Sequence, residues 1–179
     1  MSILKTSIDT ELQHRIQEEL EWDPHVDASG IAAKVEEGVV TLTGFVDTYA
    51  KKIAARDAVH RVRGVLDIAD EVQVRLAVRA KSDQEVAQAV RTALMWDVFV
   101  PDDKIMSTVS NGWVTLEGKV DRFHQREDAG HAVERLAGVS GVTNRIEVKP
   151  QAVDAAKIRT SIEDALTRRA EREAKRIQV

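Results

Sequence analysis

The chain has 179 residues, of which 43% are hydrophobic, with no cysteine and a net charge of −4. The absence of cysteine excludes disulfides and thiolate metal sites, and the negative charge argues against nucleic-acid binding by bulk electrostatics. No apolar run approaches the roughly 18 residues of a membrane-spanning helix, and residues 1–7 do not resemble a signal peptide, so we expect a cytoplasmic protein.

The chain repeats itself at an interval of 74 residues. Residues 9–76 align with residues 83–150 without a gap, and 22 of the 68 aligned pairs are identical. The recurring positions hold turn glycines and apolar residues, whereas no candidate catalytic group recurs. The repeat therefore predicts two domains of one fold.

Each repeat begins with an amphipathic helix. Leu12, Ile16 and Leu20 follow one another at four-residue spacing, as Val86, Val90 and Leu94 do in the second repeat, which indicates one apolar stripe per helix. The first helix is expected to end before Pro24.

A β-hairpin follows each helix. Its two-residue turns are Glu37-Gly38 and Asn111-Gly112, and Asn-Gly is a strong hairpin signal. The alternation after the turn places Val40, Leu42 and Gly44 on one face of the sheet.

A second helix and a last strand complete each repeat. Asp47 and Asp121 are predicted as N-caps of the second helices, and Gly64 and Gly138 as the C′ residues that end them. The order helix-strand-strand-helix-strand predicts an α+β fold of tandem αββαβ units, each with two helices packed on one face of a three-stranded mixed sheet.

The tail restarts the pattern of the first helix. Ile158, Ile162 and Leu166 repeat its four-residue spacing, so residues 155–179 are predicted to be the helix of an incomplete third unit. Self-association through this incomplete unit is one expected interaction.

These residues resemble the BON domain, a family of bacterial osmotically induced and nodulation proteins. The motif Gly-x-Val-Thr-Leu-x-Gly-x-Val-Asp occurs at Gly38–Asp47 and again at Gly112–Asp121, between a Trp-Asp pair and a terminal Gly-Val…Val segment. The resemblance implies a non-enzymatic binding or adaptor protein, linked to osmotic or general stress and transport-associated functions. Its implied partners are proteins or phospholipid membranes, and one reading is a peripheral membrane protein.

Gly44 and Gly118 interrupt apolar strands, where glycine is costly. Such a glycine marks a close approach, either by another element of the chain or by a ligand. Both readings remain open at this stage.

Three tryptophans are candidate contact residues. Trp22 and Trp96 recur at the ends of the first helices, where they pack between repeats or anchor an interface or a membrane headgroup layer. Trp113 alternates out of phase with Val114, so we expect it on the opposite sheet face, exposed beside Thr115 and Phe99, as a protein-binding patch.

Reactive groups form no recognisable catalytic constellation. The five histidines do not recur between repeats, and His124 with Asp128 or Glu127 with His131 gives only paired ligands at helical spacing. There is no phosphate-binding loop and no HExxH motif. We therefore expect no catalytic residue, no cofactor, no metal and no nucleic-acid partner.

Overall fold

The computed structural model describes residues 2–76, 81–149, 159–160 and 162–170. The two repeats lie in the first two of these ranges, apart from residue 150. Every helix in the described ranges is too short or too polar to cross a bilayer.

The first repeat has the predicted order of elements. They are helix α1 (Ser2–Trp22), the 3-10 turn η1 (Ala28–Gly30), strands β1 (Ile31–Glu36) and β2 (Val39–Val46), helix α2 (Tyr49–Arg61) and strand β3 (Asp67–Val74). Helix α1 ends two residues before Pro24, as expected from the restriction that proline places on its predecessor.

The second repeat has the same elements in the same order. They are helix α3 (Asp83–Trp96), the 3-10 turn η2 (Asp102–Lys104), strands β4 (Ile105–Ser110) and β5 (Trp113–Val120), helix α4 (Phe123–Glu134) and strand β6 (Gly141–Val148). The two repeats therefore share one topology, which confirms the predicted α+β fold.

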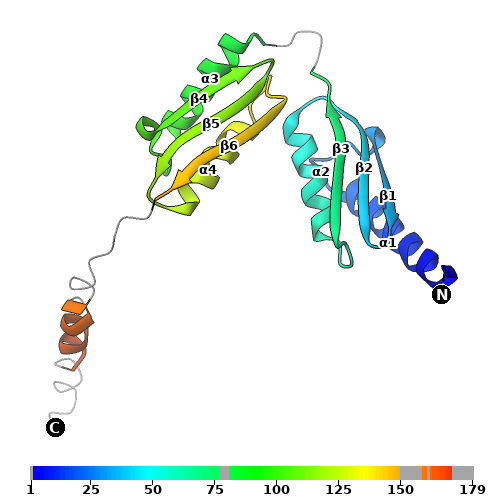
Figure 1. Cartoon of the computed structure of the whole chain (residues 1–179), viewed down its shortest axis with the longest axis horizontal. Helices are drawn as coiled ribbons and strands as arrows, with labels where there is room; N and C mark the ends of the chain where they lie inside the picture. The colour runs from blue at the N-terminus through cyan, green and yellow to red at the C-terminus, as the bar shows by residue number, and fades with distance from the viewer. Residues whose placement is uncertain (1, 77–80, 150–158, 161, 171–179) are drawn as a thin grey trace. The chain divides into compact units, whose positions relative to one another are not determined.

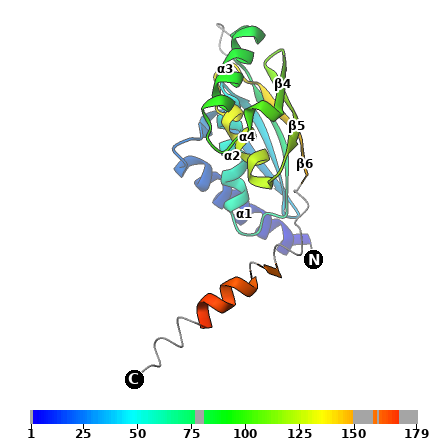
Figure 2. The same ribbon diagram turned by 90° about the vertical axis from the view of Figure 1, so that its left-hand side faces the viewer.

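Each repeat contains one three-stranded mixed sheet. Its order is β1-β2-β3 in the first repeat and β4-β5-β6 in the second, with an antiparallel hairpin followed by a parallel pair. Figures 1 and 2 show α3 and α4 on one side of the second sheet, and Figure 1 shows α1 and α2 on one side of the first. Within the described residues of each repeat, neither helix covers the other face of the sheet.

Each helical face closes over its own apolar core. The predicted stripe Leu12, Ile16 and Leu20 is buried, and so is its counterpart Val86, Val90 and Leu94. The alternation of the second strand is confirmed, since Val40 and Leu42 are fully buried. Each repeat therefore has a complete core, although a domain of this size buries only about 60% of its unfolded surface.

A carboxylate of the first helix holds the hairpin turn of each repeat. Asp9 accepts hydrogen bonds from the backbone N–H groups of Glu37 and Gly38, at 2.9 and 3.3 Å. Both turn residues have positive φ, 51° and 81°, as a type I′ turn requires. The pairing ties together segments that are 28 residues apart in the chain.

Asp83 does the same in the second repeat. It accepts from the N–H groups of Asn111 and Gly112, both at 2.8 Å. Asp9 and Asp83 occupy equivalent positions at the 74-residue interval. The hairpin anchor is thus a feature of the repeat, and the sequence reading did not find it.

The predicted N-caps of the second helices are wrong. Thr48, not Asp47, caps α2 by accepting from the Lys51 N–H, and the cap residue of α4 is Arg122, one residue after Asp121. Asp47 instead pairs with the ammonium group of Lys51 at 2.8 Å, and Asp121 pairs with Lys104 at 3.1 Å. These carboxylates make ion pairs in place of the expected cap hydrogen bonds.

The predicted C′ glycines also lie further along the chain than expected. Helix α2 ends at Arg61 with Val62 as its C-cap, so Gly64 comes one residue after the C′ position. Gly64 and Gly138 have φ values of +109° and +97°, which a residue without a side chain adopts most easily. They shape the turn into the last strand rather than end the helix.

In the tail, the described residues 159–160 and 162–170 are helical. Ile162 and Leu166 are exposed. Ile158 and the rest of the predicted third unit lie outside the described residues.

Candidate binding surface

Exposed apolar side chains gather at the end of helix α3 and just after it. We call residues 95–99, the last two residues of α3 and the three that follow, the apolar loop, and its large side chains are Met95, Trp96, Val98 and Phe99. Their exposed fractions are 58%, 77%, 92% and 68%. Exposed large apolar side chains that cluster in this way are typical of interaction sites, whereas single exposed apolar residues are normal.

The apolar loop is held by the residue in its middle and by the residue after it. The carboxylate of Asp97 accepts a hydrogen bond from the Phe99 N–H at 2.9 Å, and the Asp97 carbonyl accepts from the Val100 N–H at 3.2 Å. Val100 is buried in the core of the second repeat. Because Val100 points inward, the turn presents Val98 and Phe99 to solvent.

A second contact fixes the chain beyond the loop. Arg91 of α3 donates to the backbone carbonyl of Asp102 and pairs with its carboxylate, both at 3.0 Å. The segment from helix α3 to strand β4 is therefore tied at both ends, and the apolar loop is a structured turn.

The first repeat builds the same turn from different side chains. We call residues 21–25 the polar loop; it is Glu21-Trp22-Asp23-Pro24-His25. Asp23 accepts from the His25 N–H at 2.9 Å, as Asp97 accepts from Phe99. The shared Trp-Asp pair therefore has a structural cause, because the aspartate holds the turn that leaves the helix.

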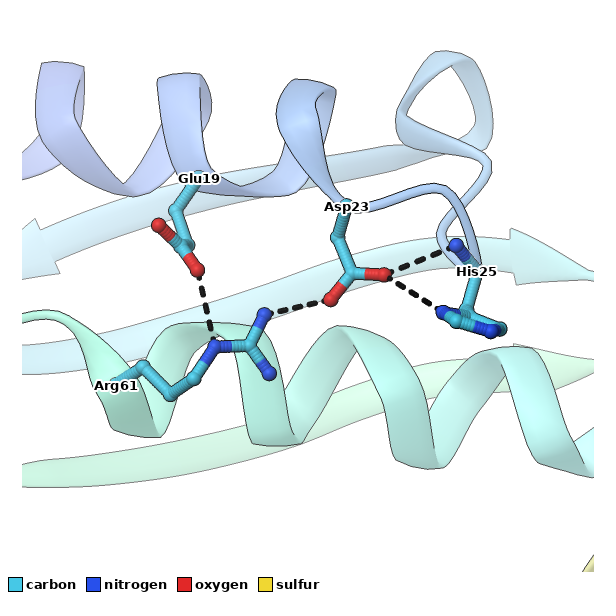
Figure 3. Close-up of polar contacts among 4 residues, drawn as sticks. All are labelled: Glu19, Asp23, His25 and Arg61. Carbon is cyan, nitrogen blue, oxygen red and sulfur yellow. Dashed lines mark hydrogen bonds and ion pairs between the residues drawn. The ribbon is translucent and has the colours of Figure 1, made fainter.

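The polar loop is further held by an arginine from α2. Arg61 donates from Nε to Glu19 at 3.0 Å and from a terminal nitrogen to Asp23, while the His25 ring lies 3.3 Å from the same Asp23 carboxylate (Figure 3). The hydrogen bond from the His25 N–H, followed by that from Arg61, lowers the pKa of Asp23. The carboxylate is thus held in its charged form.

The structure places the two recurring tryptophans on the surface of their own repeats. Trp22 is 83% exposed and Trp96 is 77% exposed. Trp22 stands between Glu21 and Asp23, whereas Trp96 belongs to the apolar loop. Sequence reasoning found both tryptophans but missed Met95 and Val98, although the run of apolar residues in a loop was a readable signal.

Trp113 lies on the helix-free face of the second sheet, as predicted from its alternation. Its indole is half exposed, covers Gly141 on the neighbouring strand and donates from Nε1 to the Thr143 hydroxyl at 2.8 Å. Trp113 pairs with Ser110, the last residue of β4. Phe99 instead lies before the turn η2, which leads into the first residue of β4. The structure thus places Trp113 and Phe99 at opposite ends of β4 and does not bring them together.

The two strand glycines are explained by the chain itself. A Cβ on Gly44 would lie 2.0 Å from the carbonyl oxygen of Gly30, and one on Gly118 would lie 2.2 Å from that of Lys104. Both φ values are positive, +127° and +153°. The close approach comes from the 3-10 turns before β1 and β4, so no ligand is needed to account for these glycines.

Chemistry-bearing clusters are sparse in the described part of the chain. No group of three or more His, Cys, Asp or Glu residues there could hold a metal ion. No side-chain nitrogen or oxygen that is buried there lacks a hydrogen-bond partner. The arrangement offers surfaces for contact rather than a set of reactive groups in a cleft.

The model of the BON domain matches residues 8–75 and 82–150, one match per repeat. The chain belongs to the BON domain family. Osmotically-inducible protein Y of Escherichia coli (strain K12) is a relative with 26% identity over 146 residues, which cover 79% of this chain and 73% of that protein. Both comparisons make this a tandem BON protein related to a protein named for osmotic induction.

Two solved structures of CdsD, a structural protein of the type III secretion system of Chlamydia trachomatis, are also similar. The C-terminal domain has 16% identity and a TM-score of 0.34, with 79% of this chain and 67% of that chain covered. The second has 15% identity and a TM-score of 0.35, with 86% and 68% covered. At these scores the whole-chain superpositions add nothing about function.

Proposed function

We propose that this tandem BON protein is a non-enzymatic, stress-linked binding module that attaches to the interfacial layer of a phospholipid membrane through the apolar loop of its second repeat. The observation that carries the proposal is the exposure of Met95, Trp96, Val98 and Phe99 on one structured turn. Tryptophan favours the boundary between headgroups and acyl chains, because its apolar ring system and its polar N–H are both accommodated there, whereas the other three side chains contribute apolar area alone.

The charges around the loop favour insertion over electrostatic attachment. Asp97 lies within the loop and Asp103 follows it, while Asp102 pairs with Arg91, so the loop has no excess of basic residues around it. An anionic bilayer surface would repel these carboxylates. Burial of each large apolar side chain contributes about 1.5–3 kcal/mol when complete, so partial insertion of four of them suffices for reversible binding.

Vesicle co-sedimentation of variants in which the two loops exchange side chains tests the proposal. The triple variant Met95→Glu, Val98→Pro and Phe99→His gives the apolar loop the side chains of the polar loop. We expect the partition coefficient onto phosphatidylcholine vesicles to fall at least about tenfold, because three inserted side chains are lost. Binding that is unchanged in this variant would refute the role of the loop.

The reverse exchange and a salt series sharpen the result. The variant Glu21→Met, Pro24→Val and His25→Phe builds a second apolar loop and is expected to increase binding. Binding to vesicles with added phosphatidylglycerol should not weaken between low and high salt, because insertion is not screened and salt only reduces the repulsion of the carboxylates. Strong loss of binding in salt would instead point to attachment through the basic residues of the tail.

A protein partner is the second candidate, and Trp113 is the observation that favours it. Its half-exposed indole is held flat over Gly141 by the Thr143 hydrogen bond, which makes a rigid aromatic anchor on an open sheet face. A pull-down from stressed cells with wild type and with Trp113→Val, the residue at the equivalent position of the first repeat, tests it. A partner lost only in the variant supports this candidate.

The tail adds a smaller proposal. The helical residues 162–170, with Ile162 and Leu166 exposed, support the reading of this segment as the first helix of a third unit. Amide exchange across the tail in the full chain tests it, since a docked helix protects its amides and a solvated one does not.

A further inference from the structure

The outer strands of the two sheets differ in how they are protected. The outer strands are β1 and β3 in the first repeat and β4 and β6 in the second. The outer side of such a strand carries backbone N–H and C=O groups that another strand can bind, and proteins protect these edges with charges or side-chain caps. Three of the four edges are protected, and β4 is not.

The edge of β3 is capped by side chains. Lys52 of helix α2 donates to the carbonyl of Val72 at 2.7 Å, and the carboxylate of Asp70 accepts from the Val72 N–H at 3.1 Å. Both backbone groups of Val72 are thereby used. A strand approaching this edge would have to displace a lysine and an aspartate.

The edge of β6 is capped by the side chains at the equivalent positions, although the capped carbonyl differs. The Asn144 side chain accepts from the Ile146 N–H at 3.2 Å and donates to the carbonyl of Arg126 at 2.7 Å. Arg126 in turn donates to the Asn144 carbonyl at 3.4 Å. The capping of the parallel edge is therefore a property of the repeat.

The edge of β1 is protected by charge. Lys34 and Glu36 stand on its helix-free face and form an ion pair with a nitrogen–oxygen distance of 2.6 Å. Both side chains are 72% exposed. Addition of a strand here would partly desolvate two charges, which disfavours pairing.

Strand β4 has neither kind of protection. Its sequence is Ile105-Met106-Ser107-Thr108-Val109-Ser110, without a charge or a proline. Thr108 and Ser110 occupy the positions of Lys34 and Glu36. Among the described residues, no side chain hydrogen-bonds to the backbone of Ser107 or Val109.

The hairpin decides which backbone groups of β4 face outward. A two-residue turn closes on a hydrogen-bonded pair, here Ser110 with Trp113, and hydrogen-bonded pairs alternate along an antiparallel ladder. Thr108 and Met106 therefore bond to β5, and Ser107 and Val109 direct their N–H and C=O groups away from it. The Ile105 N–H is already bound by the Asp102 carbonyl.

We propose that β4 pairs antiparallel with β4 of a second copy of this chain, about a two-fold axis at Thr108. Ser107 then exchanges backbone hydrogen bonds with Val109 of the other copy, and Met106 lies opposite Ser110. Thr108 meets its own copy as a close, non-hydrogen-bonded pair. The interface is isologous, and the proposal does not depend on the membrane role.

The sequence of β4 favours a second copy as the occupant. Threonine opposite threonine is a favourable cross-strand pair, and an uncharged strand opposes no like charges when it meets itself. A two-fold axis at Ser107 would instead require a hydrogen bond from the Ile105 N–H to the second copy, and this N–H already donates to the Asp102 carbonyl. The axis at Thr108 uses only groups that are available.

A five-residue ladder is a small interface, so the dimer is expected to be weak. The area buried by such a ladder falls below that of stable complexes, and we expect a dissociation constant of about 100 µM. Sedimentation equilibrium of the full chain between about 10 µM and 1 mM covers this range. A chain that stays monomeric throughout overturns the proposal.

Exchanging the residues at equivalent positions of β1 and β4 tests whether β4 forms the interface. Thr108→Lys introduces the residue that the first repeat carries at this position, so the fold is expected to tolerate it, and the thermal melt checks this. We expect at least about tenfold weaker dimerisation, because two lysines then face each other. Lys34→Thr should not weaken it. A dimer unaffected by Thr108→Lys overturns the proposal.

Disulfide trapping measures the axis directly, because the chain contains no cysteine. Opposed residues in a non-hydrogen-bonded pair have Cβ atoms about 4.5–5.5 Å apart, close enough for a bridge after small adjustment. Thr108→Cys should form a covalent dimer in mild oxidant faster than Lys34→Cys at the same concentration. A mixture of Met106→Cys and Ser110→Cys should cross-link mainly between the two variants. Equal rates for Thr108→Cys and Lys34→Cys overturn the proposal.

Discussion

The two repeats have the same framework and different surfaces. Both hold the hairpin turn with an aspartate, at Asp9 and Asp83, and both close the edge of the last strand with side-chain caps. They differ in the loop after the first helix and on the outer strand of the hairpin. Positions that determine the fold are thus the same in both copies, whereas the exposed side chains of this loop and this strand differ.

This difference shows where duplicated domains can acquire separate roles. The polar loop forms an ion-pair cluster with Arg61 in the first repeat, while the apolar loop exposes Trp96 and Phe99 in the second. Likewise, Lys34 is replaced by Thr108 on the outer strand. We interpret the first repeat as the protected copy and the second as the one that makes contacts.

The largest expected effect comes from a shared position. Gly44→Ala and Gly118→Ala each place a Cβ about 2 Å from a backbone carbonyl oxygen at a positive φ. We expect each to lower the free energy of unfolding of its own repeat by about 3 kcal/mol, from strain and overpacking together. Urea unfolding followed by amide exchange within residues 9–76 and 83–150 measures each repeat.

If the two repeats share one framework, the two glycine substitutions should lower the stability of their own repeats by the same amount. Gly130→Ala is a control with a smaller expected loss, because Gly130 lies in helix α4 without a positive φ and its Cβ would lie 3.2 Å from the Asn144 side-chain amide, which is hydrogen-bonded to the Arg126 carbonyl. If Gly118→Ala were harmless while Gly44→Ala unfolded its repeat, the two frameworks would not be equivalent.

A smaller effect is expected at the hairpin anchors. Asp83→Ala leaves two turn N–H groups without their acceptor, which should cost about 1–2 kcal/mol of stability in the second repeat. Asp9→Ala should cost less, since one of its two hydrogen bonds is longer, 3.3 Å. Chemical denaturation of the two single variants measures the ranking, and a larger loss for Asp9→Ala would contradict it.

Much of this architecture could be predicted from local pattern. The apolar stripe Leu12, Ile16 and Leu20 and the Asn111-Gly112 turn are local signals, because helix period and turn conformation depend on neighbouring residues. The predicted N-cap at Asp47 was wrong because the adjacent Thr48 competes for the same role. The strand order could not be predicted, since it depends on pairing between distant segments.

The contact surfaces were harder to predict for the same reason. Trp113 was placed correctly on the open face, because alternation along a strand is local. Its supports, Gly141 and Thr143, come from a strand about 30 residues away. The anchor Asp83 was missed because its partners lie 28 and 29 residues along the chain.

The smallest expected effect concerns the polar loop and acid. The pKa of Asp23 is lowered by the His25 N–H and by Arg61, and its side chain is only 10% exposed. A carboxyl group whose pKa is lower in the folded state stabilises the fold fully when the pH is above its pKa in the unfolded chain, about 3.9. This stabilisation is lost as the pH falls through its pKa in the folded state. The first repeat of the wild type should therefore lose stability faster than Asp23→Asn as the pH falls below about 5.

Arg61→Gln is the matched variant, since it removes the second cause of the lowered pKa and keeps the first. Its acid dependence should lie between those of the wild type and Asp23→Asn. Denaturant midpoints measured from pH 3 to pH 7, with amide reporters in each repeat, give the slopes. Parallel slopes for all three proteins would show that the cluster in Figure 3 does not link the polar loop to pH, and the contrast between the two loops would then rest on the apolar residues alone.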